Sequence, residues 1–167
     1  MVGTLAGVLI TAVAGLITTV VTLRDQRQVA SDQASLQLTQ RVRDDRKEAF
    51  VEYLSAYRLM LDSAQKIASN DEFANLRERE GNATTPRRFE MAFPEVASQY
   101  GRSYYMLQII AGSETREAAK KANDALWKLA QGSFSVSKEE FQALDLDTSR
   151  TRKDMRNAMR SDLGVSG

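Results

Sequence analysis

Three arginines near the carboxyl end of the chain have the spacing of a charged binding surface. Arg152, Arg156 and Arg160 recur every four residues, so on a helix they form one basic ridge. Such a ridge could contact anionic lipid headgroups or nucleic-acid phosphates, in both cases by charge and without reading a sequence. The competing interpretation is an ordinary solvated helix face, because Asp154 and Asp162 offset part of the charge. The ridge is therefore a candidate contact with an anionic surface.

A second set of chemically capable side chains consists of four carboxylates on neighbouring turns: Asp44, Asp45, Glu48 and Glu52. Di-iron helical bundles use inward carboxylates, but they combine them with a Glu-x-x-His motif, and this chain has no histidine. The stretch DLDTSRTRKDMR begins like a calcium loop, yet Arg150 and Arg156 replace the turn glycine and the bidentate glutamate. We therefore interpret these acids as solvated and predict no metal site.

The composition narrows the chemistry further. The 167 residues include neither His nor Cys, which excludes His-dependent zinc sites, the standard catalytic triads and disulfides. The sequence contains no Gly-x-Ser-x-Gly elbow, phosphate-binding glycine loop or dinucleotide fingerprint. With 23 basic and 22 acidic residues, no overall field attracts nucleic acid. We expect a protein that is not an enzyme, that holds no cofactor and that has no specific nucleic-acid partner.

Tyrosines at helical spacing are candidates for a ligand pocket or a stacking platform. Tyr100, Tyr104 and Tyr105 lie close together in the sequence, and Trp127 follows on the next predicted helix. Their spacing fits the core of a bundle, or an exposed face for a partner, better than it fits a ligand site.

The opening segment has the length and composition of a membrane span. Residues 2–23 carry no charged side chain, and a helix rising about 1.5 Å per residue would cross the roughly 30 Å hydrocarbon layer. A secretory signal peptide is the alternative, since residues 12–14 resemble a small-residue cleavage site. No Lys or Arg precedes the apolar run, however, and the run continues well past Ala14. We predict a transmembrane anchor over residues 1–23.

Small residues line one face of this predicted span. Gly3, Gly7, Thr11 and Gly15 recur every four residues, and Thr18 continues a row of hydroxyls at seven-residue spacing. Small residues let two helix backbones approach closely in lipid, and hydroxyls can bond across the contact. The pattern predicts self-association of the span, although solitary spans also carry such stripes by chance.

The charges that flank the span predict its orientation. Arg24 and Arg27 follow it, whereas only Met1 precedes it. Because positive charge is retained on the cytoplasmic side, we predict a single-pass protein whose C-terminal domain is cytoplasmic.

Helical patterns continue along the rest of the chain. Residues 24–45 are polar and lack Gly and Pro, which predicts a helical stalk, and Val29, Leu36 and Val42 form a thin seam of the coiled-coil kind. Apolar residues at steps of three and four then predict the first bundle helix: Phe50, Tyr53, Leu54, Tyr57, Leu61, Ala64 and Ile67. Gly81 and Pro86 interrupt this pattern and predict a loop near residues 71–92.

Three further helices are expected after that loop. The second bundle helix covers residues 94–111, and Ser113 is the expected N-cap of the third. The inner stripe of the third helix is expected to contain Ala118, Ala122, Ala125 and Leu129. Ser137 and Glu140 form a capping box that starts the fourth helix, with a brief break expected at residues 147–149.

Three stretches resemble one group of proteins: RDDRKEAFVEYLSAY, GSETREAAKKANDALWKLA and the ending MRNAMRSDLGVSG. They are similar to a loose group of small, functionally uncharacterised actinobacterial proteins, in which a membrane helix and an Arg-rich stalk precede a helical bundle. The resemblance implies a bacterial inner-membrane location and a bundle fold. It implies no catalytic residue.

Together these patterns predict an all-α protein. A transmembrane helix (1–23) continues through a polar stalk (24–45) into an antiparallel up-down four-helix bundle (46–167). The expected function is that of a non-enzymatic, membrane-anchored interaction or scaffold protein, whose partners are membrane lipid and either another protein or further copies of itself. The alternative is a subunit of an oligomeric pore or channel, assembled through the Gly and Thr stripe of the span.

Overall fold

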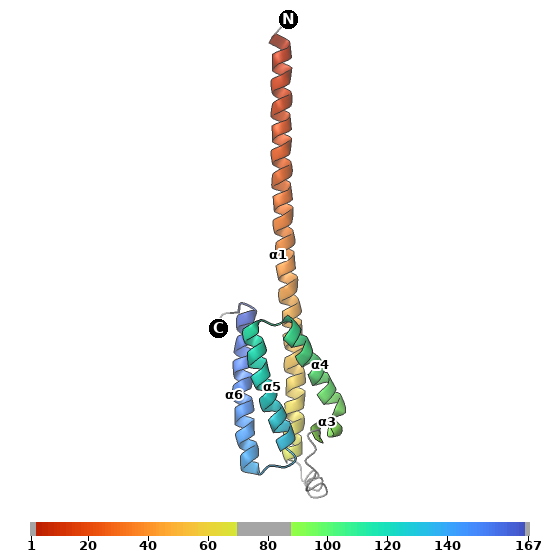
Figure 1. Cartoon of the computed structure of the whole chain (residues 1–167), viewed down its shortest axis with the longest axis vertical. Helices are drawn as coiled ribbons and strands as arrows, with labels where there is room; N and C mark the ends of the chain where they lie inside the picture. The colour runs from red at the N-terminus through yellow and green to blue at the C-terminus, as the bar shows by residue number, and fades with distance from the viewer. Residues whose placement is uncertain (1–2, 70–87, 166–167) are drawn as a thin grey trace. The chain divides into compact units, whose positions relative to one another are not determined.

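The computed structural model describes the backbone of residues 3–69 and 88–165, and the side chains of residues 26, 28–69 and 88–165. Every regular element within these residues is a helix, which confirms the all-α prediction. The helices are α1 (Gly3–Ser69), α3 (Arg88–Ala92), α4 (Pro94–Ile110), α5 (Ser113–Gly132) and α6 (Lys138–Asp162) (Figure 1).

The chain divides into two compact units, Met1–Arg43 and Asp44–Gly167. In the first unit the described side chains are exposed, including Val29, Leu36 and Val42 of the expected seam. The side chains of residues 1–25, and so of the predicted span, lie outside the described part of the chain. Among the residues searched, no helix is long and apolar enough to cross a bilayer. The membrane anchor therefore stays a prediction.

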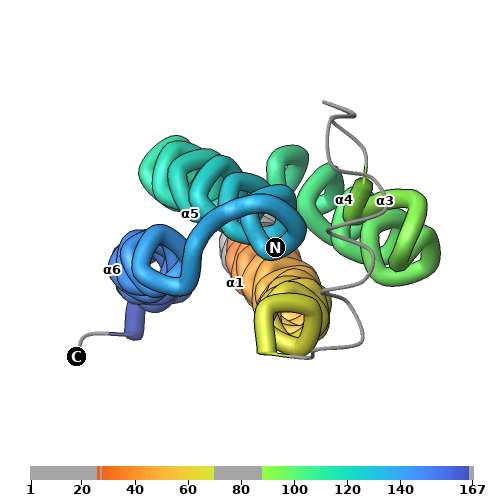
Figure 2. Tube along the Cα trace, turned by 90° about the horizontal axis from the view of Figure 1, so that it is seen from below, coloured from red at the N-terminus to blue at the C-terminus, as the bar shows by residue number. Residues whose placement is uncertain are grey.

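The second unit is a helical bundle. Consecutive long helices run in alternating directions: residues 44–69 of α1, then α4, α5 and α6 (Figure 1). Figure 2 shows α4 and α6 on opposite sides of α1 and α5, so that α1 and α5 form the centre. This arrangement places α4 at an edge of the bundle, with one face left open to solvent.

The inner faces of the helices follow the hydrophobic periodicity. On α1, Phe50, Tyr53, Tyr57 and Ile67 are buried in the core, as their spacing predicts. Met60 is buried as well, which widens the face beyond the predicted stripe.

Helix α5 differs from its predicted inner stripe. Ala118 is only half-buried, whereas Thr115, Ala119 and Leu126 are buried in addition to Ala122. A central helix packs against neighbours on more than one side, so its buried face is wider than the stripe of a helix that covers one surface. Small alanines suit this position because they allow close approach of the neighbouring helices.

The helix ends differ in how far the local sequence determines them. At the start of α6 the predicted capping box is present: the Glu140 amide donates to Ser137 Oγ at 3.2 Å, and the Ser137 amide donates to Glu140 Oε2 at 3.0 Å. At the start of α5 the N-cap is Gly112 and not Ser113, and no side chain of the helix caps it. That correction has a tertiary cause, because the Gly112 amide donates to Asp162 Oδ2 at 2.8 Å.

Two features differ from the sequence prediction: the expected break within α6 and part of the expected loop before α4. The break at residues 147–149 is absent, since α6 is continuous there and Thr148 Oγ1 donates to the carbonyl oxygen of Leu144 at 2.8 Å. In the segment 71–92, expected as a loop, residues 88–92 form α3 and Phe89 is fully buried. Residues 70–87 lie outside the described part of the chain.

Candidate functional site

The arginines of the predicted ridge and the nearby Asp154 lie on different sides of α6. Arg156 and Arg160 of the predicted ridge are exposed, and Arg152 is half-buried. Arg152 lies toward α1, where its charge acts on the Tyr57 hydroxyl. Asp154 instead lines a groove between α6 and α5. The side of α6 with Arg156 and Arg160 is therefore mainly basic, although Asp145 also faces α1 and accepts a hydrogen bond from Gln65 there.

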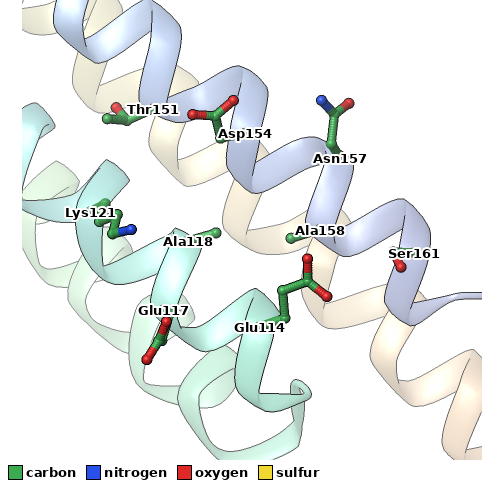
Figure 3. Close-up of a pocket in the computed structure, with 9 residues that line it drawn as sticks. All are labelled: Glu114, Glu117, Ala118, Lys121, Thr151, Asp154, Asn157, Ala158 and Ser161. Atoms are coloured by element: carbon green, nitrogen blue, oxygen red, sulfur yellow. The ribbon is translucent and has the colours of Figure 1, made fainter.

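The groove between α5 and α6 has a volume of about 500 Å³ (Figure 3). Ala118 and Ala158 line it, and its polar side chains are Glu114, Glu117, Lys121, Thr151, Asp154, Asn157 and Ser161. Three carboxylates and one ammonium group give it a net negative charge. All of its acidic side chains are exposed to solvent, so it is an open, polar surface groove.

An apolar patch lies on the open face of α4. Tyr105, Met106 and Ile109 are 68%, 48% and 60% exposed and lie on neighbouring turns. We call these three residues the α4 patch. Gly101 lies one turn before Tyr105, and a Cβ atom added there would meet nothing within 4 Å. A partner helix could therefore approach the backbone of α4 closely at Gly101.

The aromatic residues considered as a group in the sequence have different positions. Tyr100 is fully buried, Tyr104 and Trp127 are half-buried, and Tyr105 is exposed. The buried ring of Tyr100 packs edge-on against Trp127, with centroids 6.3 Å apart. The core interpretation therefore holds for Tyr100, and the exposed-face interpretation holds for Tyr105.

Buried tyrosine hydroxyls form a hydrogen-bonded network across three helices. Tyr100 donates to Asn123 Oδ1 at 3.1 Å, and the Tyr53 and Tyr100 hydroxyls are 3.0 Å apart. Because the proton of Tyr100 is directed to Asn123, Tyr53 is the donor between the two phenols. Tyr57 donates to the carbonyl oxygen of Thr148 at 3.5 Å. The network joins α1, α4 and α5, and Tyr57 extends the contact to α6.

Burial disfavours the charged form of these phenols. Desolvation raises the pKa of Tyr53, Tyr57 and Tyr100 far above the ordinary tyrosine value of 10.0. All three therefore stay protonated at neutral pH and cannot act as general bases there. Their hydrogen bonds satisfy polar groups in the core, which is a structural role.

A polar clasp joins three parts of the bundle at one end. Arg46 Nη1 donates to Asp162 Oδ1 at 2.9 Å, and Arg46 Nε donates to the carbonyl oxygen of Ile110 at 3.0 Å. The other carboxylate oxygen of Asp162 accepts from the Gly112 amide. We call these four residues the clasp. It connects α1, the turn between α4 and α5, and the end of α6.

Other candidates do not assemble into a site. Asp44, Asp45, Glu48 and Glu52 are exposed, and no group of potential ligands among the searched, described residues could hold a metal ion. Residues 145–156, which begin like a calcium loop, lie within helix α6. Of the other site predictions, Gly3, Gly7, Thr11, Gly15 and Thr18 belong to the segment whose side chains are not described.

The Ser-x-x-Lys spacing that some acyl-transfer enzymes use was missed in the sequence, where it occurs twice. Ser135 and Lys138 are both exposed to solvent, and the other pair is Ser63 and Lys66. The Ser63 hydroxyl is buried and donates to the carbonyl oxygen of Leu59 at 2.8 Å, whereas Lys66 is exposed. The pair therefore lacks the nucleophile-to-base contact that catalysis needs.

No protein-family model matches this chain. No curated protein and no solved structure matches it either. The functional argument therefore rests on the surfaces of the bundle and on the predicted span.

Proposed function

We propose that the protein is a non-enzymatic, single-pass membrane protein of a bacterial inner membrane that associates with further copies of itself. Residues 2–23 cross the membrane, residues 24–45 form a polar helical stalk, and an antiparallel up-down four-helix bundle lies on the cytoplasmic side. The observation that carries the self-association is the α4 patch. The apolar composition of residues 2–23 supports the anchoring.

The size of the α4 patch favours a weak contact between tethered copies. Its three side chains expose on the order of 300–400 Å², which is within the range of functional patches on monomers. Two such patches would bury roughly 700 Å², less than the ~1,200 Å² of a stable interface in solution. Confinement to a membrane raises the effective concentration of the copies, so a contact of this size becomes effective there. A second copy is the simplest partner, because all anchored copies share the same membrane.

The interior of the bundle supports a role without catalysis. The buried hydroxyls of Ser103, Ser133 and Thr148 donate to backbone carbonyl oxygens, and the tyrosine phenols bond as described above. These hydroxyls are thus satisfied within the fold, and among the described residues Thr115 Oγ1 is the buried side-chain atom without a partner.

Crosslinking through α4 tests the proposal. Because the natural chain has no cysteine, Gly101→Cys gives a single thiol beside the α4 patch, at a position with room for a side chain. In membranes containing the full chain, we expect a short bifunctional maleimide to join copies through this thiol. Adding Tyr105→Ser and Ile109→Ser should lower the crosslinked fraction about tenfold, because apolar burial is lost. Both side chains are exposed, so the melting temperature should stay unchanged.

The control is a single thiol on another face. Ser55→Cys is exposed on α1, and it should crosslink only at the level of random collisions. Equal yields at both positions, or a yield that Tyr105→Ser and Ile109→Ser leave unchanged, would contradict association through α4. If Gly7→Leu and Gly15→Leu abolish crosslinking and the α4 changes do not, the span carries the association instead.

A further inference from the structure

The basic residues of α6 have basic neighbours on α1. On α1, Lys47 and Arg58 are eleven residues apart, which is about three helical turns, and therefore share a face. Gln65 lies on the same face and donates to Asp145 Oδ1 of α6 at 3.1 Å. This face of α1 is thus the one that adjoins α6. We call the combined surface the basic face; it consists of Lys47, Arg58, Lys153, Arg156 and Arg160.

We infer that the basic face docks on anionic phospholipid headgroups, so that the bundle lies against the bilayer to which it is anchored. This inference rests on the anchoring in the proposed function and adds a lipid class and a surface to it. The other proposed contact, through α4, lies on the opposite side of the α1 and α5 pair from α6 (Figure 2).

The charges of the basic face are free to meet an external anion. In the described part of the chain no ion pair involves Lys153, Arg156 or Arg160. Arg58 has an acidic neighbour, Asp62, but at 3.8 Å and with both side chains more than half exposed. Such an exposed pair is weak and exchanges readily for another anion.

Charge complementarity favours a bilayer with anionic lipids. A basic residue at such a surface contributes about a fivefold gain in binding. The acidic groove with Asp154 lies on the other side of α6, so only one side of this helix is attracted and the bundle acquires a preferred orientation. Val51, exposed four residues after Lys47, adds an apolar contact of the kind found at bilayer surfaces.

The composition of the basic face also favours lipid over nucleic acid. The 22 residues of a helical stalk over 24–45 would span about 33 Å, so docking on the same bilayer requires the chain to change direction between the span and the bundle, near the boundary of the two units at Arg43 and Asp44. Proteins that bind single-stranded nucleic acid stack bases on aromatic side chains, and no residue of the basic face is aromatic.

Headgroup quenching in vesicles tests the inference. The full chain carrying Ser149→Cys has its single thiol on the exposed, basic side of α6. We expect a fluorophore on this thiol to be quenched by headgroup-labelled lipid in vesicles of equal parts phosphatidylcholine and phosphatidylglycerol, but not in phosphatidylcholine alone. Roughly 0.5 M salt should remove the quenching, because it screens charge beyond a few ångströms. Flotation of the same vesicles reports whether the protein is anchored.

Two matched sets of Gln substitutions, one on α6 and one on α5, identify the surface that docks on lipid. Changing Lys153, Arg156 and Arg160 to Gln should lower the docked-to-free ratio about fivefold for each charge removed. Changing Lys120, Lys121 and Lys128 of α5 to Gln removes the same number of exposed charges from another face, and it should have little effect.

Several outcomes would overturn the inference. Equal quenching in both lipid mixtures, or an equal loss in the α5 variant, would contradict docking through the basic face. Nucleic acid would be the ligand if two results were found together. Quenching would not respond to phosphatidylglycerol, and the α6 changes would abolish binding of a single-stranded oligonucleotide. Flotation without quenching would overturn the docking alone, whereas failure to float would overturn the anchoring in the proposed function.

Discussion

Replacement of Tyr100 by alanine is expected to lower the free energy of unfolding by about 3–5 kcal/mol, the usual cost of removing a buried aromatic side chain. Tyr100 is 1% exposed, and its ring packs against Tyr53, Tyr57 and Trp127. The change would leave a cavity and remove the acceptor for the Tyr53 hydroxyl. Denaturant unfolding of the full chain in detergent, followed by helical circular dichroism, measures the effect.

A double-mutant cycle of Tyr→Phe changes separates the contribution of packing from that of hydrogen bonding at the same position. Tyr100→Phe keeps the ring but leaves the buried Tyr53 hydroxyl without its partner, so it should cost about 1–3 kcal/mol. Adding Tyr53→Phe removes that unsatisfied group, and the double variant should be less destabilised than the sum of the single changes. Strict additivity would show that the two phenols do not interact. Tyr105→Phe, on the exposed side of α4, is the control and should change stability by less than about 0.5 kcal/mol.

Loss of the Asp162 carboxylate is expected to have the second-largest effect. Asp162→Ala removes the acceptor for both Arg46 and the Gly112 amide, and the side chains of Arg46 and Asp162 are only 32% and 12% exposed. A half-buried guanidinium and a helix N-terminus would both lose their partner, which should lower the free energy of unfolding by about 2–3 kcal/mol. The same unfolding measurement applies.

The controls for this prediction lie on the same helix and in the same clasp. Asp154→Ala removes an exposed carboxylate of α6 and should change stability by less than about 0.5 kcal/mol. With Arg46→Met already present, Asp162→Ala should cost less than it does alone, because one of its two partners is gone. If Asp162→Ala and Asp154→Ala have equal effects, the clasp does not stabilise the bundle.

Local sequence signals predicted much of the fold. The three- and four-residue spacing of Phe50, Tyr53 and Tyr57 predicted the buried face of α1, and the capping box of Ser137 and Glu140 predicted the start of α6. These features depend on residues within a few positions of one another, so the chain itself contains the information.

Features that depend on distant residues were not predictable in the same way. Asp162 caps α5 from fifty residues away, and Tyr53 meets Tyr100 across 47 positions. Hydrophobic spacing also gave too narrow a buried face for α5, because periodicity indicates which side is inside but not how many neighbours a helix has.

The candidate surfaces also combine features that the local sequence predicts with features that depend on the packing of distant residues. The periodicity of Arg152, Arg156 and Arg160 placed them on α6, but only the packing of α1 against α6 adds Lys47 and Arg58 to the same surface. Of the α4 patch, only Tyr105 was a candidate for an exposed partner face in the sequence, since Met106 and Ile109 have the spacing of ordinary residues of an amphipathic helix. Their exposure follows from the position of α4 at the edge of the bundle.

Accessibility of one thiol in cells tests the proposed membrane topology most directly. Ser135→Cys places a single thiol in the exposed turn between α5 and α6, on other elements than the α4 patch. In spheroplasts that express the full chain, a membrane-impermeant maleimide should leave this thiol unlabelled, and lysis should make it reactive. That result would support a bundle on the cytoplasmic side of the membrane. Labelling of intact spheroplasts would contradict the account and place the bundle outside the cytoplasm.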